Sequence, residues 1–184
     1  MTKYIAFLRG INVGGKNKIA MPALKTAFEA IGFSNVITYI NSGNIMFTTG
    51  IRDIGELVSQ SEAAIADKFG LAIPVTIVSA DELSELVKHA PAWWNQDRES
   101  IHYAIFVIAP AGPAEIFAAV GEIKPEYEQV DHYGNVIFWS APRETFSKTR
   151  WSKIAASSVN NKVTIRNANT VSKLLVLARS ETGH

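Results

Sequence analysis

The segment from Gly10 to Asn17, GINVGGKN, combines three glycines with a lysine and follows a short apolar run. Glycine amides together with a lysine can hold a phosphate group, and the spacing from Gly10 to Gly15-Lys16 is that of a nucleotide-binding P-loop. Asn17 stands where Mg²⁺ coordination calls for serine or threonine, and the next helix is expected only near Pro22. The pattern therefore favours a looser anion-binding loop, with a loop that only turns the chain as the alternative.

Charge is distributed unevenly along the sequence. The 18 basic and 17 acidic residues give a net charge of +1, yet residues 1–28 contain five basic residues and residues 145–180 contain seven, with no acid in either segment. Clustered like charges attract phosphates, counter-ions or nucleic acid. The two basic segments are therefore either parts of an anion site or separately solvated faces.

Few residues are suited to covalent or metal chemistry. The chain has no cysteine, which excludes disulfides, thiolate catalysis and cysteine-ligated metals. The four histidines lack metal-ligand spacing, and they are His89, His102, His132 and His184. Ser147-Lys148 and Ser152-Lys153 are adjacent pairs, which do not face each other on a helix, and no carboxylate pair stands out. We therefore predict no metal and no cofactor, and the sequence identifies no catalytic residue.

Composition indicates a well-packed protein of the cytoplasm. With 184 residues, 47% of them hydrophobic, the chain can bury an ample core. The apolar stretch near the N-terminus is too short for a signal peptide, and no run reaches the roughly 20 residues of a membrane span. We expect a cytoplasmic protein without membrane contact.

The first part of the chain alternates strand-like and helix-like segments. Four β-rich runs are expected to form strands, at residues 3–8, 36–40, 44–48 and 74–78. Helices are expected between them, the first with Pro22 in its initial turn and the second over residues 53–69, ended by Gly70. Asn41 to Asn44 should form a hairpin turn. The predicted order is βαββαβ.

The second part repeats this order. After a helix opened by Ser79 and Glu82, strands are expected at residues 102–108 and 162–165 and around a hairpin turning at 133–135, with helices from Pro113 to Gly121, near 149–158 and at 169–179. Residues 4–7 resemble 103–106, and residues 42–47 resemble 133–138, at spacings of 99 and 91. We predict an α+β protein with two antiparallel halves, residues 1–78 and 101–184, joined by a linker at 79–100, with Gly43 and Gly134 in equivalent turns.

Several strings together resemble a known family. They are Arg9 to Lys18, Thr38 to Asn44, Ser152-Lys153 and Thr164 to Leu174, and the chain is similar over its whole length to the mainly bacterial domain of unknown function family 1697. The resemblance implies two ferredoxin-like halves and no assigned activity. The family's characteristic residues fall on Arg9, Gly10, Asn12, Gly14, Gly15, Lys16, Ser42, Gly43, Asn44, Lys153, Arg166, Asn167, Asn169 and Thr170. Ala168 departs from the tryptophan that the family commonly shows there.

The motifs and the basic segments coincide, which favours binding of an anionic, phosphorylated ligand, a nucleotide or RNA, in a basic groove. The expected ligand-binding residues are Arg9, Asn12, Gly14, Gly15, Lys16, Lys18, Ser42, Asn44, Lys153, Arg166, Asn167 and Thr170. We expect the cations of the first loop to converge with Lys153 and Arg166. The alternatives are an enzyme acting on a phosphorylated small molecule and a structural or partner-binding protein without a ligand.

Overall fold

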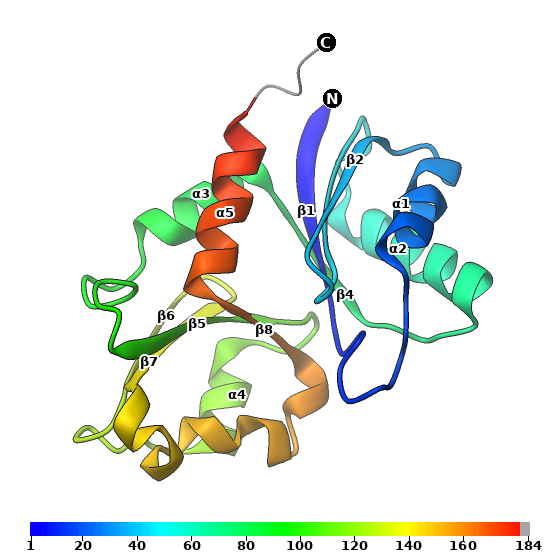
Figure 1. Ribbon diagram of the computed structural model, residues 1–184. Coiled ribbons are helices and arrows are strands. Elements are labelled where there is room, and N and C mark those ends of the chain that lie inside the picture. Colours follow the sequence, from blue (N-terminus) through cyan, green and yellow to red (C-terminus); the bar gives the residue numbers. More distant parts are fainter. Residues whose placement is uncertain (181–184) are drawn as a thin grey trace. The chain divides into compact units, whose positions relative to one another are not determined.

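A computed structural model describes residues 1–180 of the chain, an α+β protein with two four-stranded antiparallel sheets (Figure 1). The chain forms two compact units. Unit 1 contains Met1–Leu83 and the chain from Leu174 on, and unit 2 contains Ser84–Lys173. The boundaries between the units fall within two helices, over residues 80–88 and 168–179.

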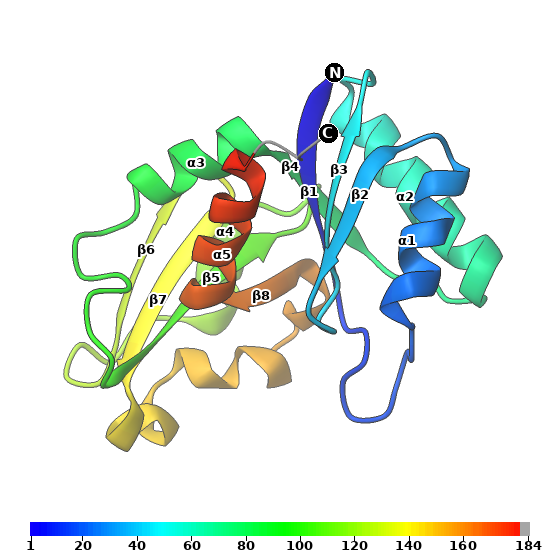
Figure 2. The same cartoon turned by 45° about the horizontal axis from the view of Figure 1, so that its top comes forward.

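Unit 1 contains the first sheet and the helices that cover one of its faces. Its elements are β1 (Thr2–Leu8), α1 (Met21–Ala30), β2 (Ser34–Tyr39), β3 (Asn44–Thr49), α2 (Ile54–Phe69) and β4 (Val75–Ser79). The strand order is β2-β3-β1-β4, and α1 and α2 lie on the same side of the sheet (Figure 2). The four strands and two helices confirm the element order predicted for this part of the chain.

Alternation along β1 explains why its sequence is almost wholly apolar. Tyr4, Ala6 and Leu8 pack in the core beneath the helices with residues of β3, among them Phe47. Ile5 and Phe7 point to the opposite face, because successive strand residues alternate, and they are also buried. A strand buried on both faces carries no polar alternation.

Local signals set the ends of α2. The Asp53 carboxylate accepts a hydrogen bond from the amide of Glu56 at 2.9 Å, which satisfies one of the free amides of the first turn. Gly70 ends the helix in the left-handed conformation at φ 66°, and its amide donates to Ala66 O. Both ends agree with the helix predicted from these residues.

Unit 2 contains the second sheet, in the order β6-β7-β5-β8. Its elements are β5 (Ser100–Val107), α4 (Pro113–Val120), β6 (Gln129–Tyr133), β7 (Val136–Pro142) and β8 (Val163–Asn167). The helices α3 (Ala80–Lys88) and α5 (Ala168–Arg179) cross the two boundaries between the units. Trp139 and Trp151 are both buried in the core on the α4 side of the sheet.

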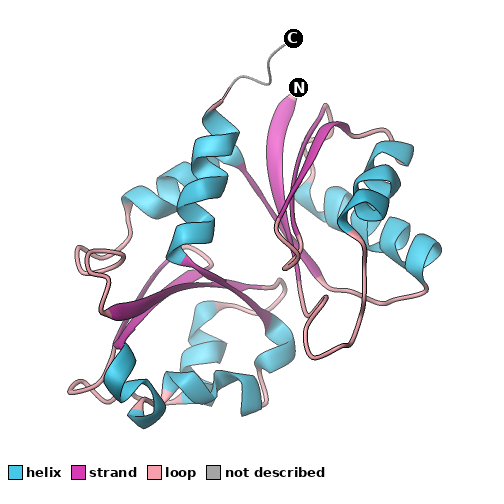
Figure 3. Ribbon diagram, in the orientation of Figure 1, coloured by secondary structure: helices cyan, strands magenta, loops and turns pink. Residues whose placement is uncertain are grey.

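The helix predicted near residues 149–158 is present in part, as a 3₁₀ helix over Trp151–Ala156 and not as a continuous α-helix. It is one of three short 3₁₀ segments that connect β7 to β8, at Arg143–Lys148, Trp151–Ala156 and Asn160–Lys162 (Figure 3). The buried carboxylate of Glu128 accepts hydrogen bonds from the amides of Arg150 at 2.8 Å and Trp151 at 3.1 Å. A side chain thus captures backbone donors here, and it contributes to holding short turns in place of a continuous α-helix.

The two sheets correspond with a register that differs by one residue from the predicted match. Phe7 pairs with Asn44 in the first sheet, and Phe106 pairs with Val136 in the second. Because Phe7 and Phe106 are 99 residues apart, Asn44 corresponds to Val136, at a spacing of 92. The predicted spacing of 91 is therefore wrong by one residue. The difference matters, because a one-residue slip moves every side chain to the other face of a sheet.

The slip also changes the correspondence of the hairpin turns. Gly43 O accepts a hydrogen bond from the amide of Leu8, and Asn135 O accepts one from the amide of Val107, both at 2.9 Å. Gly43 therefore corresponds to Asn135, whereas Gly134 precedes it by one residue. The two glycines lie in corresponding turns but not at equivalent positions.

Candidate ligand-binding site

The glycine-rich loop folds back on itself as a small hairpin. The amide of Lys16 donates to Val13 O at 3.0 Å, and the two residues between them, Gly14 and Gly15, have φ values of 58° and 73°. Positive φ at both central positions is the tight hairpin turn that favours glycine. Because α1 begins only at Met21, the loop does not run into a helix as a P-loop does.

Asn12 ties this loop together. Its Nδ2 donates to Ile19 O and to Asn41 O, each at 2.9 Å, and its Oδ1 accepts from the amide of Ile19 at 2.8 Å. The hairpin and the turn between β2 and β3 therefore form one connected piece. Lys16 and Lys18 are exposed on it.

The motif of the β2–β3 turn also has a structural role. Asn44 is fully buried, and its Nδ2 donates to Tyr39 O and to Ser42 Oγ, each at 3.0 Å. Gly43 has a φ of 86°, and a Cβ atom on it would lie 2.8 Å from the Cβ of Leu8. These contacts account for the motif without a ligand, and ligand binding by Ser42 and Asn44 stays a prediction.

The final motif continues from β8 into α5. Arg166 is only 6% exposed, and desolvation by burial lowers its pKa to about 10. Its guanidinium donates to Thr164 Oγ1 at 2.8 Å and to Ile165 O at 2.9 Å. Asn167 Oδ1 accepts from the amide of Thr170 at 2.8 Å and so caps α5.

The predicted convergence of five cations is untested. Arg9, Lys16 and Lys18 belong to unit 1, whereas Lys153 and Arg166 belong to unit 2. Lys153 is exposed, in contrast to Arg166. Within unit 1, the structure does bring Asn12 and the turn containing Ser42 together, through Asn41.

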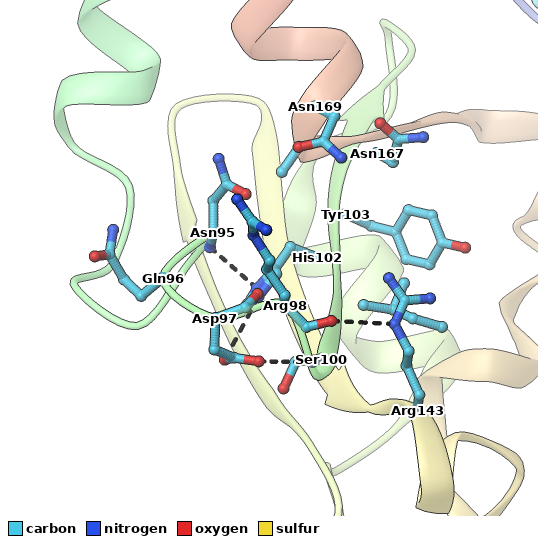
Figure 4. Close-up of a pocket in the computed structure, with 12 residues that line it drawn as sticks. Asn95, Gln96, Asp97, Arg98, Ser100, His102, Tyr103, Arg143, Asn167 and Asn169 are labelled. Carbon is cyan, nitrogen blue, oxygen red and sulfur yellow. Dashed lines mark hydrogen bonds and ion pairs between the residues drawn. The ribbon is translucent and has the colours of Figure 1, made fainter.

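A polar cavity of about 700 Å³ opens in unit 2 (Figure 4). Three parts of the chain line it: the segment before β5 and its first residues, Arg143 after β7, and the start of the final motif. The lining residues are Asn95, Gln96, Asp97, Arg98, Ser100, Ile101, His102, Tyr103, Arg143, Asn167, Ala168 and Asn169. Of the predicted site residues, Asn167 lies in this lining.

Two arginines give the cavity its charge. Arg143 follows β7, which pairs with β5 so that Pro142 lies opposite Ser100, and its Nε donates to Arg98 O at 3.3 Å. Asp97 is the acidic residue of the lining, and its carboxylate accepts from the amide of Ser100 at 2.6 Å. This hydrogen bond lowers the pKa of Asp97, so the lining carries two guanidinium groups against one carboxylate.

His102 and its neighbours anchor the segment that forms one wall. His102 Nδ1 accepts from the amide of Asn95 at 3.0 Å, and Nε2 lies 2.9 Å from Asp97 O. Trp94 Nε1 donates to Tyr103 O at 2.8 Å. These bonds hold the residues just before β5 against the first residues of that strand.

Sequence reasoning missed Arg98, Arg143 and His102. Arg98 and Arg143 lie between the two basic segments, in the part of the chain where acids outnumber bases, so charge clustering does not reveal them. The pairing of β5 with β7 brings them together across 45 residues. A prediction of the register between β5 and β7 would have been needed to place the two arginines together from the sequence.

Among residues 1–180, no group of three or more His, Asp or Glu side chains is placed to hold a metal ion. In the same described part of the chain, no helix is long and apolar enough to cross a membrane.

Comparisons with known proteins place the chain in a family. The family model described as Protein of unknown function (DUF1697) matches residues 1–138. The chain belongs to this family. The DUF1697 protein is also similar to a solved structure, that of the conserved bacterial protein SP0830 from Streptococcus pneumoniae. The two share 31% sequence identity and a TM-score of 0.85, over 97% of this chain and 99% of the other.

No curated protein matched this chain. The family match ends at residue 138, before Arg143 and the Arg166–Thr170 motif, whereas the similarity to SP0830 covers nearly the whole chain.

Proposed function

We propose that this DUF1697 protein binds a small anionic, phosphorylated ligand in the cavity of unit 2. The observation that carries the proposal is the placement of Arg98 and Arg143 beside one cavity of about 700 Å³. Arginine presents a planar set of donors that matches a phosphate or carboxylate. A concave polar site with two such groups is suited to a negatively charged ligand.

The rest of the lining supports orientation of the ligand. Asn95, Gln96, Asn167 and Asn169 are amides that can donate or accept neutral hydrogen bonds. The cavity volume falls within the usual range for small-molecule sites, about 300–1,000 Å³. These features favour a ligand of mononucleotide size over a long nucleic acid, which engages many phosphates along a groove.

We propose the glycine-rich loop as a second region that contacts anions. Lys16 and Lys18 are exposed on a loop without acids, and we retain the prediction that they and Arg9 share a groove with Lys153 and Arg166. Exposed Lys16 and Lys153 are the suitable test positions, since Arg166 is buried. Weaker RNA binding in both alanine variants, with a shallower salt dependence, would support the groove, and unchanged binding in both would contradict it.

We also propose that the two units are ferredoxin-like repeats of one duplicated ancestor and that the protein acts in the cytoplasm. The strand orders β2-β3-β1-β4 and β6-β7-β5-β8 support the first proposal. The absence of cysteine from the sequence is consistent with the second. Superposition of the two experimentally determined halves and imaging of a tagged full-length chain would test them.

Binding assays with arginine variants test the cavity. Calorimetry against nucleotides, sugar phosphates and inorganic phosphate should give one ligand per chain, with a shallow salt dependence. Arg98→Ala and Arg143→Ala should each weaken binding by about 1–3 kcal/mol, the value of a hydrogen bond to a charged group. Arg52→Ala is the matched control, because Arg52 is an exposed arginine of unit 1.

Two outcomes would contradict this function. One is the absence of binding to every phosphorylated compound tested. The other is equal affinity of Arg98→Ala, Arg143→Ala and the control variant. Chemical change of a bound compound during the assay would instead favour the enzyme alternative.

A further inference from the structure

We propose that His102 is a positioning residue whose charge state controls one wall of the cavity. When its ring is neutral, it holds the segment Asn95–Ser100 in place, and protonation releases the start of this segment at Asn95. The effect on ligand affinity rests on the function proposed above, whereas the movement of the segment does not.

Both ring nitrogens of His102 bind this wall. Nδ1 lies 3.0 Å from the amide nitrogen of Asn95, and Nε2 lies 2.9 Å from Asp97 O (Figure 4). His102 is 7% exposed, so solvent does not readily replace these partners. The segment supplies Asn95, Gln96, Asp97, Arg98 and Ser100 to the lining.

The identity of the partners fixes the protonation state of the ring. A backbone amide is always a donor, so Nδ1 must offer a lone pair to Asn95, and a carbonyl oxygen is always an acceptor, so Nε2 must carry the hydrogen. This arrangement is the neutral tautomer with hydrogen on Nε2. In the imidazolium both nitrogens are donors, so a protonated Nδ1 would face the amide of Asn95 donor to donor.

The charged ring has other acceptors within reach. Ser140 Oγ, on the neighbouring strand β7, lies 2.5 Å from Nδ1, and Asp97 Oδ2 lies 3.6 Å from Nε2. A proton added at Nδ1 can therefore be donated to Ser140, while Nε2 keeps Asp97. The ring has two alternative sets of partners, and Asn95 belongs to one of them.

The backbone of Asn95 favours release. Asn95 has a φ of 60°, the left-handed conformation that residues other than glycine adopt infrequently, although asparagine tolerates it better than most. The hydrogen bond to His102 holds this conformation through the amide of the same residue. Once that bond is lost, Asn95 can return to negative φ, which moves the wall that continues to Arg98.

Charged groups of both signs lie around His102. The Asp97 carboxylate faces the ring, and Glu126 lines a smaller cavity of about 290 Å³ together with His102 and Ser140. The Glu128 carboxylate is bound to the Trp139 indole and to the amides of Arg150 and Trp151. Arg98 and Arg143 line the main cavity, and β8 places Arg166 opposite Ala104, on the same face of β5 as His102.

The sign of the effect follows from the donor pattern. Lowering the pH adds the proton that removes the Asn95 bond, so the wall is held at high pH and released at low pH. We expect anion affinity to fall on acidification, even though the added charge on His102 would by itself attract an anion.

The test follows the segment directly, without a ligand. The full chain labelled with ¹⁵N is titrated from about pH 8 to about pH 5, the range in which histidine side chains titrate. We expect the Asn95 amide resonance and its three-bond HN–Hα coupling, which reports φ, to change together with the His102 ring resonance. A constant coupling through the His102 transition would overturn the proposal.

Two variants separate this role from general stability. His102→Asn retains an acceptor but cannot titrate, so the Asn95 transition should disappear, whereas His132→Asn, at an exposed histidine of β6, should retain it. If His102→Asn does not fold, Ser140→Ala serves instead. It removes the acceptor of the charged ring, so the transition should move to lower pH, and an unmoved or raised transition would contradict the proposal.

Sulfate binding measured over the same range distinguishes the two proposals, because the charge of sulfate does not change there. Affinity at about pH 5 should be at least about tenfold weaker than at about pH 8 in the wild type and in His132→Asn. If sulfate, phosphate and nucleotides all fail to bind but the Asn95 backbone still changes with pH, the proposed function is wrong and the proposed role of His102 stands. If an anion binds and the Asn95 backbone does not change with pH, only the role of His102 is wrong.

Discussion

The connection between the third and the fourth strand has a different structure in each of the two units. In unit 1, the chain passes from the third to the fourth strand through α2, a helix of 16 residues. In unit 2, the corresponding passage from β7 to β8 uses three 3₁₀ segments. The order of the strands in the sheet is nevertheless the same in both units.

The difference lies in what holds each connection to its sheet. α2 buries a stripe of side chains that includes Leu57, Ala64 and Ile65, so its attachment is spread over several apolar contacts. The 3₁₀ segments likewise bury Trp151 and Ile154 in the core of unit 2, and one buried carboxylate also binds their backbone. The carboxylate of Glu128, a residue only 2% exposed, accepts hydrogen bonds from the amides of Lys124, Arg150 and Trp151 and from Nε1 of Trp139.

One topology thus tolerates two kinds of connection, both with buried apolar side chains, and the second with a carboxylate that accepts four hydrogen bonds as well. Loss of the Glu128 carboxylate leaves four donors without their acceptor, two of them buried and two partly buried. Substitution of Glu128 therefore measures what this carboxylate adds to the apolar contacts.

Replacement of Glu128 should have the largest effect. Glu128→Ala removes the acceptor of four hydrogen bonds, and we expect the free energy of unfolding to fall by about 3–5 kcal/mol, since each buried unsatisfied donor costs about 1–3 kcal/mol before relaxation. Urea denaturation measures the change. Glu126→Ala, at an exposed neighbour, is the control and should change stability by less than about 0.5 kcal/mol.

A loss below about 1 kcal/mol in Glu128→Ala would show that water or a neighbouring group replaces the carboxylate easily. The apolar contacts of Trp151 and Ile154 would then be sufficient to hold the 3₁₀ segments. Leu57→Ala in α2 provides the reference for a single buried apolar contact, with an expected loss of about 2–4 kcal/mol.

The hairpin turns provide a second comparison. Gly43→Ala should destabilise unit 1 by more than about 2 kcal/mol, because a left-handed conformation costs about 1–2 kcal/mol and the new Cβ would also meet the Cβ of Leu8 at 2.8 Å. In Gly134→Ala the new Cβ would lie 3.2 Å from Cδ2 of Leu86, the end of a flexible side chain. Thermal unfolding of both variants should rank Gly43→Ala as the less stable, and the opposite order would contradict the one-residue difference in register.

Much of the fold could be predicted because its signals are local. Asp53 and Gly70 mark the two ends of α2, and the apolar run at residues 3–8 corresponds to β1 at Thr2–Leu8. The 3₁₀ connection could not be predicted, because it depends on Glu128, a carboxylate more than 20 residues away from the amides of Arg150 and Trp151. The residues next to Arg150 and Trp151 in the sequence do not indicate that contact.

The candidate site shows the same division. Asn167 was predicted from a motif and lines the cavity, whereas Arg98, Arg143 and His102 were not predicted. Their association depends on strand register and on the hydrogen bonds of the segment before β5. Asn12 and Asn44 were predicted from motifs as ligand-binding residues; they donate hydrogen bonds within the loops that they hold, and ligand binding by them stays a prediction.

Asn12 should have a smaller effect than the buried carboxylate. Asn12→Asp keeps an acceptor for the amide of Ile19 and loses the two donations to Ile19 O and Asn41 O, so we expect a loss of about 1–3 kcal/mol. Asn17→Asp, which loses one exposed bond to Gly10 O, is the control and should lose less than about 1 kcal/mol. Equal losses in the two variants would show that Asn12 does not tie the loop to the β2–β3 turn.

The smallest expected effect concerns a feature that the two units share. Each fourth strand ends in a residue that caps the helix after it: Ser79 Oγ accepts from the amide of Glu82 at 3.1 Å, and Asn167 Oδ1 accepts from that of Thr170 at 2.8 Å. Ser79→Ala and Asn167→Ala should each lower the free energy of unfolding by about 1 kcal/mol, the usual value of such a cap. Their functional effects should differ, because Asn167 lines the cavity and Ser79 does not. At about pH 8, a pH at which the cavity wall is held, Asn167→Ala should therefore weaken sulfate binding while Ser79→Ala leaves it unchanged. Equal sulfate affinity in the two variants would show that Asn167 only caps α5 and that the predicted motif does not contribute to the site.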